Sequence, residues 1–222
     1  CRTERMFNAP DRLPIVIDMI VADTPEARRA AIDRLLPIQR ADFSGIFRAM
    51  SPHPVTIRLL DPPIHEFLPT ERQLEEDMAR LHDLRRAARG LEVLVESART
   101  LGEGRTGALA PAFPDSAAID AIVTRKEAIL RKAAALREVN PMLGHRGVRL
   151  GLTYPEIYTM QVRAVLEAAA DCVRAGVEVH PEIMVPQVCT AQELKAVREY
   201  MSAVQAQVET TYGVKVPCRF GT

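Results

Sequence analysis

The chain lacks an excess of charge of either sign, and it lacks a long apolar run. It has 29 Lys and Arg residues against 29 Asp and Glu residues, so its formal net charge is zero. Nucleic-acid-binding domains carry a basic face, and proteins that bind anionic membrane surfaces carry basic patches. A transmembrane helix needs about 20 consecutive apolar residues, and no run here approaches that length. We therefore expect neither nucleic acid nor a membrane as a partner.

Cysteine is also scarce. The four cysteines, Cys1, Cys172, Cys189 and Cys218, show no C-x-x-C spacing. Disulfide frameworks and structural zinc sites both need closely patterned cysteines, so the sequence predicts neither of them. The pattern is typical of reduced thiols in a cytoplasmic protein, and we expect no metal ligand within this chain.

What is present is an alternation of short β-like runs with helical stretches. Residues 54–60 place Val55, Ile57 and Leu59 on one face and Arg58 on the other, which is the periodicity of a strand. Further strands are expected at residues 183–185 and 214–220, with a short one at residues 149–152. Helices are expected at residues 23–36, 115–139, 154–173 and 191–208, and from Thr70 onward. In a chain of 222 residues that is 47% apolar, this alternation favours an α/β fold with a parallel sheet.

Two of the expected helices begin with clear capping signals. Thr24 is a plausible N-cap because Pro25 follows it at the first helical position. Thr70 and Gln73 have the spacing of a capping box, in which each side chain binds the other residue's backbone N–H. Residues 101–114 are rich in Gly, Ala and Pro, and they are the best candidate for a loop between helices.

Arginines stand in three places that predict an anion site. Residues 140–149 (Asn-Pro-Met-Leu-Gly-His-Arg-Gly-Val-Arg) combine a turn, two glycines and two arginines, including Arg146. Arg58 interrupts an apolar run, and Arg2 opens the first motif of the chain. A guanidinium is costly to bury unpaired, and its planar fork matches carboxylate and phosphate groups. The alternative is that Arg58 is a salt-bridged residue at the rim of a sheet.

Four segments in this order resemble the C-terminal, phosphoenolpyruvate/pyruvate-binding domain of the pyruvate, phosphate dikinase family. They are R-T-E-R-M-F at residues 2–7, T-I-R-L-L-D-P-P-I-H-E-F at 56–67, N-P-M-L-G-H-R-G-V-R-L at 140–150 and P-E-I-M-V-P at 181–186. The resemblance runs from the first residue to the last, with a divergent stretch around residues 85–135. Pyruvate, water dikinase and the first enzyme of the bacterial sugar phosphotransferase system share the arginines but lack this version of residues 60–67.

The resemblance implies a fold and an activity. The fold is a partial (β/α)₈ TIM-type barrel over residues 1–222, with a helical insertion at about residues 71–139. The activity is that of the parent enzyme, which interconverts ATP, pyruvate and phosphate with AMP, phosphoenolpyruvate and pyrophosphate through a phosphohistidine. The nucleotide-binding domain and the phosphohistidine motif are absent from these residues. We therefore expect a piece of a larger protein, and we expect the piece alone to be inactive. As partners and location we expect a second copy in a homodimer and the cytoplasm.

The resemblance also assigns roles to residues. Arg2, Arg58 and Arg146 would bind phosphoenolpyruvate or pyruvate, and Asp61 would lie close enough to orient Arg58 or Arg2. The proton-donor cysteine and the Mg²⁺ ligands would follow Thr222, so no catalytic or metal-binding residue is assigned within this chain. Two alternatives stay open. The chain is a non-catalytic fragment or paralogue with a binding or regulatory role, or it belongs to another phosphoenolpyruvate-utilising phosphotransferase.

Overall fold

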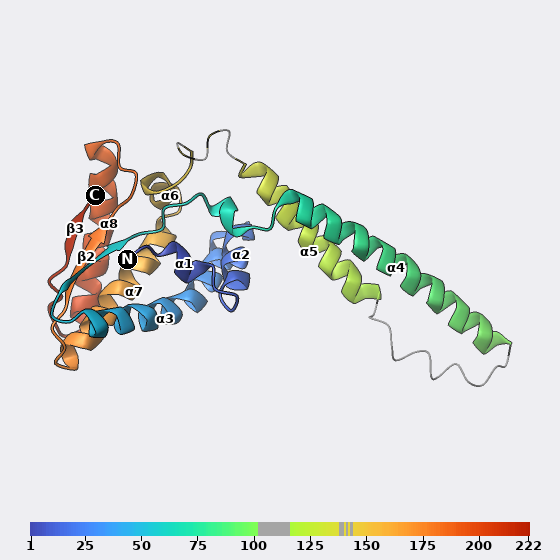
Figure 1. Ribbon diagram of the computed structural model, residues 1–222, viewed down its shortest axis with the longest axis horizontal. Helices are drawn as coiled ribbons and strands as arrows, with labels where there is room; N and C mark the ends of the chain where they lie inside the picture. Colours follow the sequence, from blue (N-terminus) through green and yellow to red (C-terminus); the bar gives the residue numbers. More distant parts are fainter. Residues whose placement is uncertain (102–115, 138–139, 141, 143) are drawn as a thin grey trace. The chain divides into compact units, whose positions relative to one another are not determined.

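The computed structural model describes residues 1–101, 116–137, 140, 142 and 144–222. The chain divides into two compact units (Figure 1). The first comprises Cys1–Phe67 and Glu138–Thr222, and the second comprises Leu68–Arg137. The second unit lies within a few residues of the range expected for the helical insertion.

The first unit contains a parallel sheet of three strands in the order β1-β2-β3. The strands are β1 (Pro54–Arg58), β2 (His180–Met184) and β3 (Arg219–Gly221). Arg2 pairs with Arg58 in a parallel bridge, so the first residues of the chain lie beside β1 on the side away from β2. Three expected strands therefore form, each with shifted bounds, and all of them pair in parallel. Closure of this sheet into a barrel stays a prediction.

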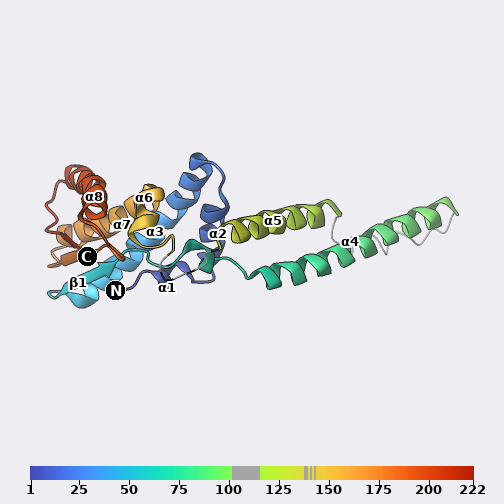
Figure 2. The ribbon, with the colours of Figure 1, turned by 90° about the horizontal axis from the view of Figure 1, so that it is seen from above.

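The helices of this unit are α1 (Glu4–Phe7), α2 (Leu13–Val21), α3 (Pro25–Met50), the 3₁₀ helix η1 (Ile64–Phe67), α6 (Val148–Thr153), α7 (Pro155–Arg174) and α8 (Ala191–Tyr212). The strands lie at one edge of this unit, with helices α3, α7 and α8 packed beside them (Figures 1 and 2). Helices α3 and α7 pack along each other, with Arg28 bound to Glu156 at 2.9 Å and Arg40 to Asp171 at 2.6 Å. The residue nearer the start of α3 pairs with the residue nearer the start of α7, and the later residue pairs with the later one. The two helices therefore run in the same direction.

Two sequence-based expectations for this unit are wrong. The helix expected to end at residue 36 continues through Pro37 to Met50, because Phe43 and Phe47 extend its buried stripe by about three turns beyond Leu35. The strand expected at residues 149–152 is instead the helix α6. A four-residue apolar run does not distinguish a strand from a short helix, and the positive φ of Gly147 turns the chain into a helix at that point.

The second unit is a pair of antiparallel helices, α4 (Glu71–Thr100) and α5 (Ser116–Ala135). The Thr70–Gln73 capping box forms as predicted at the start of α4. Ala88 of α4 packs with Ile119 and Val123 of α5 in a small apolar core. The expected loop at residues 101–114 lies, apart from Leu101, outside the described residues.

The part of the chain that the structure describes contains neither a membrane span nor a disulfide. Within the described residues, no helix combines the length and the apolar character that crossing a bilayer requires. All four cysteines are free thiols. Burial raises the pKa of the Cys172 and Cys218 thiols, the latter to about 12, so both are protonated at neutral pH.

Candidate functional site

Arg58 is the last residue of β1, and Asp61 follows it by three residues. Hydrogen bonds to β2 and α7 hold the segment between them. Beyond the strand, the Leu59 N–H donates to the Met184 carbonyl at 3.0 Å, which continues the pairing with β2. Helix α7 then fixes Leu60 from both sides. The Gln161 Oε1 atom accepts from the Leu60 N–H at 2.9 Å, and the Tyr158 hydroxyl donates to the Leu60 carbonyl at 2.8 Å. Burial raises the Tyr158 pKa, so this hydroxyl keeps its proton.

Arg146 reaches the same place from a distant part of the sequence. The Gly147 N–H donates to the Asp61 carbonyl at 2.9 Å, and the Val148 N–H donates to the Pro186 carbonyl at 2.9 Å. The start of α6 is thus hydrogen-bonded to the segments that follow β1 and β2. Active sites of parallel α/β folds lie at this end of the strands.

Asp61 is the centre of the cluster. Its Oδ2 atom lies 3.1 Å from the Arg58 Nη1 atom and 3.0 Å from the Arg146 Nη2 atom. The Asp61 side chain is only 5% exposed, and its Oδ1 atom is buried without a hydrogen-bond partner among the described residues. A buried carboxylate is stable only when cations or donors compensate it, so Asp61 and the two arginines hold one another in place.

The first residues of the chain complete the cluster. The Cys1 carbonyl accepts from the Arg58 N–H at 2.9 Å, and the Thr3 hydroxyl donates to the Arg58 carbonyl at 3.1 Å. The Glu4 Oε1 atom lies 2.5 Å from the Arg58 Nη2 atom. We refer to Glu4, Arg58, Asp61 and Arg146 as the Arg58 cluster.

Arg2 lies beside the cluster but is paired with it only through backbone. Bridge partners on neighbouring strands face the same side of a sheet, so the Arg2 and Arg58 side chains leave the sheet from one face. Arg2 is exposed, and in the part of the chain that the structure describes its guanidinium makes no ion pair. The structure thus brings Arg58, Asp61 and Arg146 into contact and places Arg2 next to Arg58. Their role as substrate ligands stays a prediction.

Four residues around this site were not predicted from the sequence. Thr3 and Glu4 hold Arg58, and Tyr158 and Gln161 hold Leu60. A signal exists for the second pair, because Tyr158 and Gln161 are polar residues on the buried face of the expected helix at residues 154–173. Glu4 carries no such signal, since a glutamate near a chain end is usually solvated.

His145 and Arg149 both contact neighbouring residues of the structure. The His145 ring lies 2.8 Å from the Thr153 hydroxyl and packs edge-on against Tyr154. Arg149 donates to the Gly144 carbonyl at 2.8 Å and to the Cys189 sulfur at 3.4 Å. Within the 140–149 motif, Pro141 and Leu143 lie outside the described residues.

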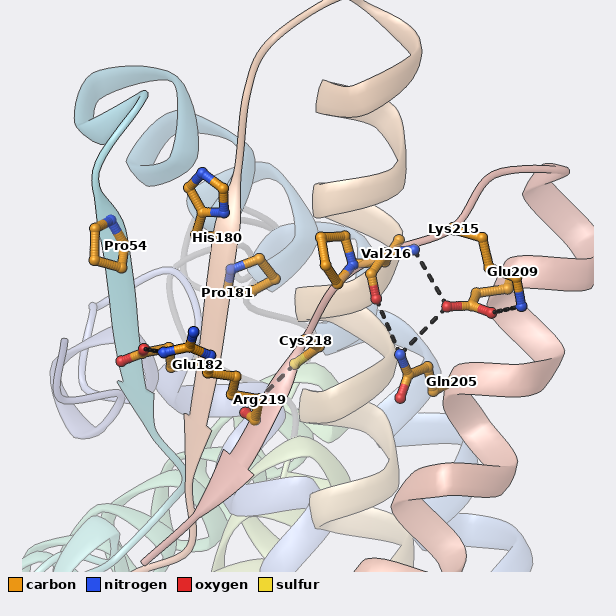
Figure 3. A pocket seen from close by; sticks show the side chains of 11 residues that line it. Pro54, His180, Pro181, Glu182, Gln205, Glu209, Lys215, Val216, Cys218 and Arg219 are labelled. Carbon is orange, nitrogen blue, oxygen red and sulfur yellow. Dashed lines mark hydrogen bonds and ion pairs between the residues drawn. The ribbon is translucent and has the colours of Figure 1, made fainter.

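A cavity of about 710 Å³ lies at the other end of the strands (Figure 3). Its lining residues come from the beginnings of β1, β2 and β3, from the end of α8 and from the segment between α8 and β3. Its cations are paired, with Lys215 2.7 Å from Glu209 and Arg219 3.6 Å from Glu182. The cations of the cavity and those of the Arg58 cluster are both matched by carboxylates, but the Arg58 cluster has the exposed Arg2 beside it as one further cation. We therefore take the Arg58 cluster, and not the cavity, as the candidate anion site.

Gly147 offers a test of how strictly Arg146 is positioned. Its φ angle is +57°, and a Cβ atom there would lie 2.6 Å from the Gln187 Cβ atom and 2.8 Å from the Pro186 carbonyl oxygen. We expect Gly147→Ala to destabilise the domain by about 1–3 kcal/mol, because both the backbone angle and the contact are unfavourable. Gly45→Ala is the control, since Gly45 lies in α3 with no atom near its Cβ position. Hydrogen exchange of the β1 and α6 peptides measures both changes, and equal protection in the two variants would contradict the expectation.

Known proteins are similar to this sequence over its whole length. The family model described as "PEP-utilising enzyme, PEP-binding domain", where PEP is phosphoenolpyruvate, matches residues 1–222. The chain is 44% identical to a pyruvate, phosphate dikinase of Entamoeba histolytica, with 100% of the chain and 22% of that protein covered. It is 41% identical to the pyruvate, phosphate dikinase of Giardia intestinalis (100% and 21% covered). Its identity to the chloroplastic pyruvate, phosphate dikinase of Flaveria trinervia is 45% (100% and 19% covered).

The chain therefore spans about a fifth of the length of these relatives. The family match extends over every residue, including the segments that carry Arg2, Arg58, Asp61 and Arg146. The chain belongs to the family of PEP-binding domains of PEP-utilising enzymes.

Proposed function

We propose that this chain is the phosphoenolpyruvate/pyruvate-binding part of a pyruvate, phosphate dikinase. The observation that carries the proposal is the contact of Arg58 and Arg146 with one buried carboxylate, Asp61, at the carboxyl end of a parallel sheet. The names of the relatives support the dikinase over another phosphoenolpyruvate-utilising phosphotransferase. The family match supports phosphoenolpyruvate binding by the domain as a whole, and we propose these arginines as the ligands.

The charge of the site suits a small polyanion. Three guanidiniums, those of Arg2, Arg58 and Arg146, stand against the two carboxylates of Glu4 and Asp61, so the local excess is one positive charge at full ionisation. Phosphoenolpyruvate offers a carboxylate and a phosphate, both of which accept charge-assisted hydrogen bonds from guanidinium forks. Arg2, exposed beside Arg58, is the first cation that an entering anion would meet.

In the proposed reaction, phosphoryl moves between a phosphohistidine of another domain and the enolate of pyruvate. The transferring group carries negative charge on its oxygens throughout, so positioned guanidiniums lower the barrier by electrostatic stabilisation. Asp61 and Glu4 would keep Arg58 and Arg146 in place while this charge shifts. The proton donor to the enolate is expected beyond Thr222 and remains a proposal.

The parent enzyme is expected to use Mg²⁺. In the described ranges, no group of three or more His, Cys, Asp or Glu side chains is placed to hold a metal ion. The described residues therefore do not fit a metal site of their own. That the Mg²⁺ ligands follow Thr222 remains a proposal.

The remaining proposals concern the whole protein. The sheet would be part of a (β/α)₈ barrel whose carboxyl ends form the substrate site. The partners would be phosphoenolpyruvate or pyruvate, the phosphohistidine domain of the same polypeptide and a second copy in a homodimer. The location would be the cytoplasm.

Phosphoryl transfer without nucleotide tests the proposed function. Incubated with phosphoenolpyruvate labelled with ³²P, the full-length protein should become labelled on a histidine and release pyruvate. Acid lability and alkali stability of the label identify a phosphohistidine. A protein that is labelled from ATP but never from phosphoenolpyruvate would contradict the proposal.

A further inference from the structure

Glu4 contacts Arg58 on a different nitrogen from the one that Asp61 uses. The Glu4 carboxylate lies 2.5 Å from Nη2, and the Asp61 carboxylate lies 3.1 Å from Nη1. We infer that Glu4 is a positioning residue that fixes the Arg58 guanidinium for the substrate anion, an inference that rests on the proposed function.

The geometry explains how two carboxylates can position one arginine. A guanidinium is planar, and each Nη atom carries two N–H groups. The Arg58 Nη2 atom donates to Glu4, and Nη1 forms an ion pair with Asp61, so rotation of the plane would weaken at least one of these charged contacts. A second N–H on each Nη atom is left for a ligand. The flexible side chain is thus ordered before the substrate arrives, so binding does not have to supply that ordering.

A purely structural role for Glu4 explains less of what is seen. Glu4 opens a helix of four residues, and the neighbouring Arg5 in the same helix is exposed. Attachment of this segment to β1 is already provided by the Cys1 carbonyl and by the Thr3 hydroxyl, both bonded to the Arg58 backbone. Among the contacts that this segment makes with Arg58, only that of Glu4 acts on the side chain. The Glu4 side chain is 17% exposed, and a carboxylate with so little solvent requires a partner such as Arg58.

Glu4 places a negative charge beside the site, so a repulsive role and a positioning role for Glu4 predict different results. If Glu4 only repelled an incoming anion, neutralising it would strengthen substrate binding however it was done. If Glu4 positions Arg58, the outcome depends on whether a hydrogen-bond acceptor remains. Glu4→Gln keeps an acceptor oxygen of similar reach, whereas Glu4→Ala removes it.

The test compares these two variants in the full-length protein. We expect Glu4→Ala to lower the rate of histidine phosphorylation from saturating phosphoenolpyruvate by about tenfold or more, because a displaced reacting group loses its productive orientation. Glu4→Gln should retain most of the rate, and phosphorylation of the histidine from ATP should be unchanged in both. Asp42→Ala is the matched control. Asp42 is a similarly half-buried carboxylate that pairs with Arg12 outside the cluster, and its removal should leave the phosphoenolpyruvate rate unchanged.

A second arm asks whether Glu4 acts through Arg58. In an Arg58→Lys background, which lacks the fork, Glu4→Ala should cause little further loss. An additive loss would overturn the inference, as would equal losses in Glu4→Ala and Glu4→Gln. Full activity of Glu4→Ala would also overturn it, and if Arg58→Ala were still inactive the proposed function would stand. Full activity of both Glu4→Ala and Arg58→Ala would instead count against the proposed function itself.

Discussion

Replacing Arg58 with alanine in the full-length protein is expected to abolish phosphoryl transfer between phosphoenolpyruvate and the histidine. Arg58 is the arginine of the cluster that two carboxylates hold, by Nη1 and by Nη2. Loss of one preorganised donor to a developing oxyanion typically lowers a rate by about 10²–10³-fold, and Arg58 offers more than one donor. Phosphorylation of the histidine from ATP should be nearly unchanged, because that step takes place in another domain. Labelling from each donor measures the two half-reactions separately.

The Arg58 experiment needs a check that the domain remains folded. Asp61 keeps Arg146 as a partner when Arg58 is removed, so hydrogen-exchange protection of β2 should persist in Arg58→Ala. Arg34→Ala is the control for loss of an arginine, since Arg34 is 56% exposed and pairs with Asp18 at 3.1 Å. Retention of transfer from phosphoenolpyruvate in a folded Arg58→Ala protein would remove Arg58 from the site.

Asp61→Ala is expected to cause the largest loss of stability. The substitution removes the carboxylate that Arg58 and Arg146 share, in a place where the Asp61 side chain is 5% exposed. Removing one partner of a buried ion pair commonly costs about 3–5 kcal/mol, because the remaining charges lose their compensation. Asp61→Asn should cost less, since an amide oxygen still accepts a hydrogen bond from one arginine. Hydrogen exchange of the β1 and α6 peptides reports the free energy of opening around the cluster.

An exposed aspartate provides the comparison for Asp61. Asp83 is 69% exposed and pairs with Arg86 within α4, and surface pairs of this kind contribute little. Asp83→Ala should therefore leave the protection of its helix almost unchanged. If Asp61→Ala and Asp83→Ala gave equally small changes, Asp61 would not be the stabilising centre of the cluster.

Local signals in the sequence predict much of this fold. Thr24 and Thr70 cap their helices as expected, because a capping interaction depends only on residues within one turn. The alternation of apolar and polar residues around Ile57 predicts β1, because this two-residue period is also a local signal. The continuation of α3 beyond Pro37 was missed because burial of Phe43 and Phe47 depends on what packs against them. Tertiary packing outweighs a local helix-breaking signal there.

The sequence predicted that Asp61 would lie close to Arg58 or Arg2, but it did not predict the other contacts of the candidate site. The resemblance singled out Arg2, Arg58, Arg146 and Asp61, and the structure puts the last three in contact. That Asp61 also accepts a hydrogen bond from Arg146, and that Glu4 holds the far side of Arg58, follow only from the three-dimensional arrangement. Ion pairs between residues far apart in the chain produce no repeating pattern from which the sequence alone could predict them.

The backbone hydrogen bonds from Gly147 and Val148 have a consequence for how this family can diversify. They bind the segment that follows Arg146 directly to the carbonyls of Asp61 and Pro186. Main-chain atoms that follow the α4–α5 hairpin in the sequence therefore set the position of Arg146. The hairpin is then free to change in length or sequence over generations without disturbing the cluster. We expect the sequence of the hairpin to vary independently of the cluster, while the residues around Gly147 must keep the hydrogen bonds that position Arg146.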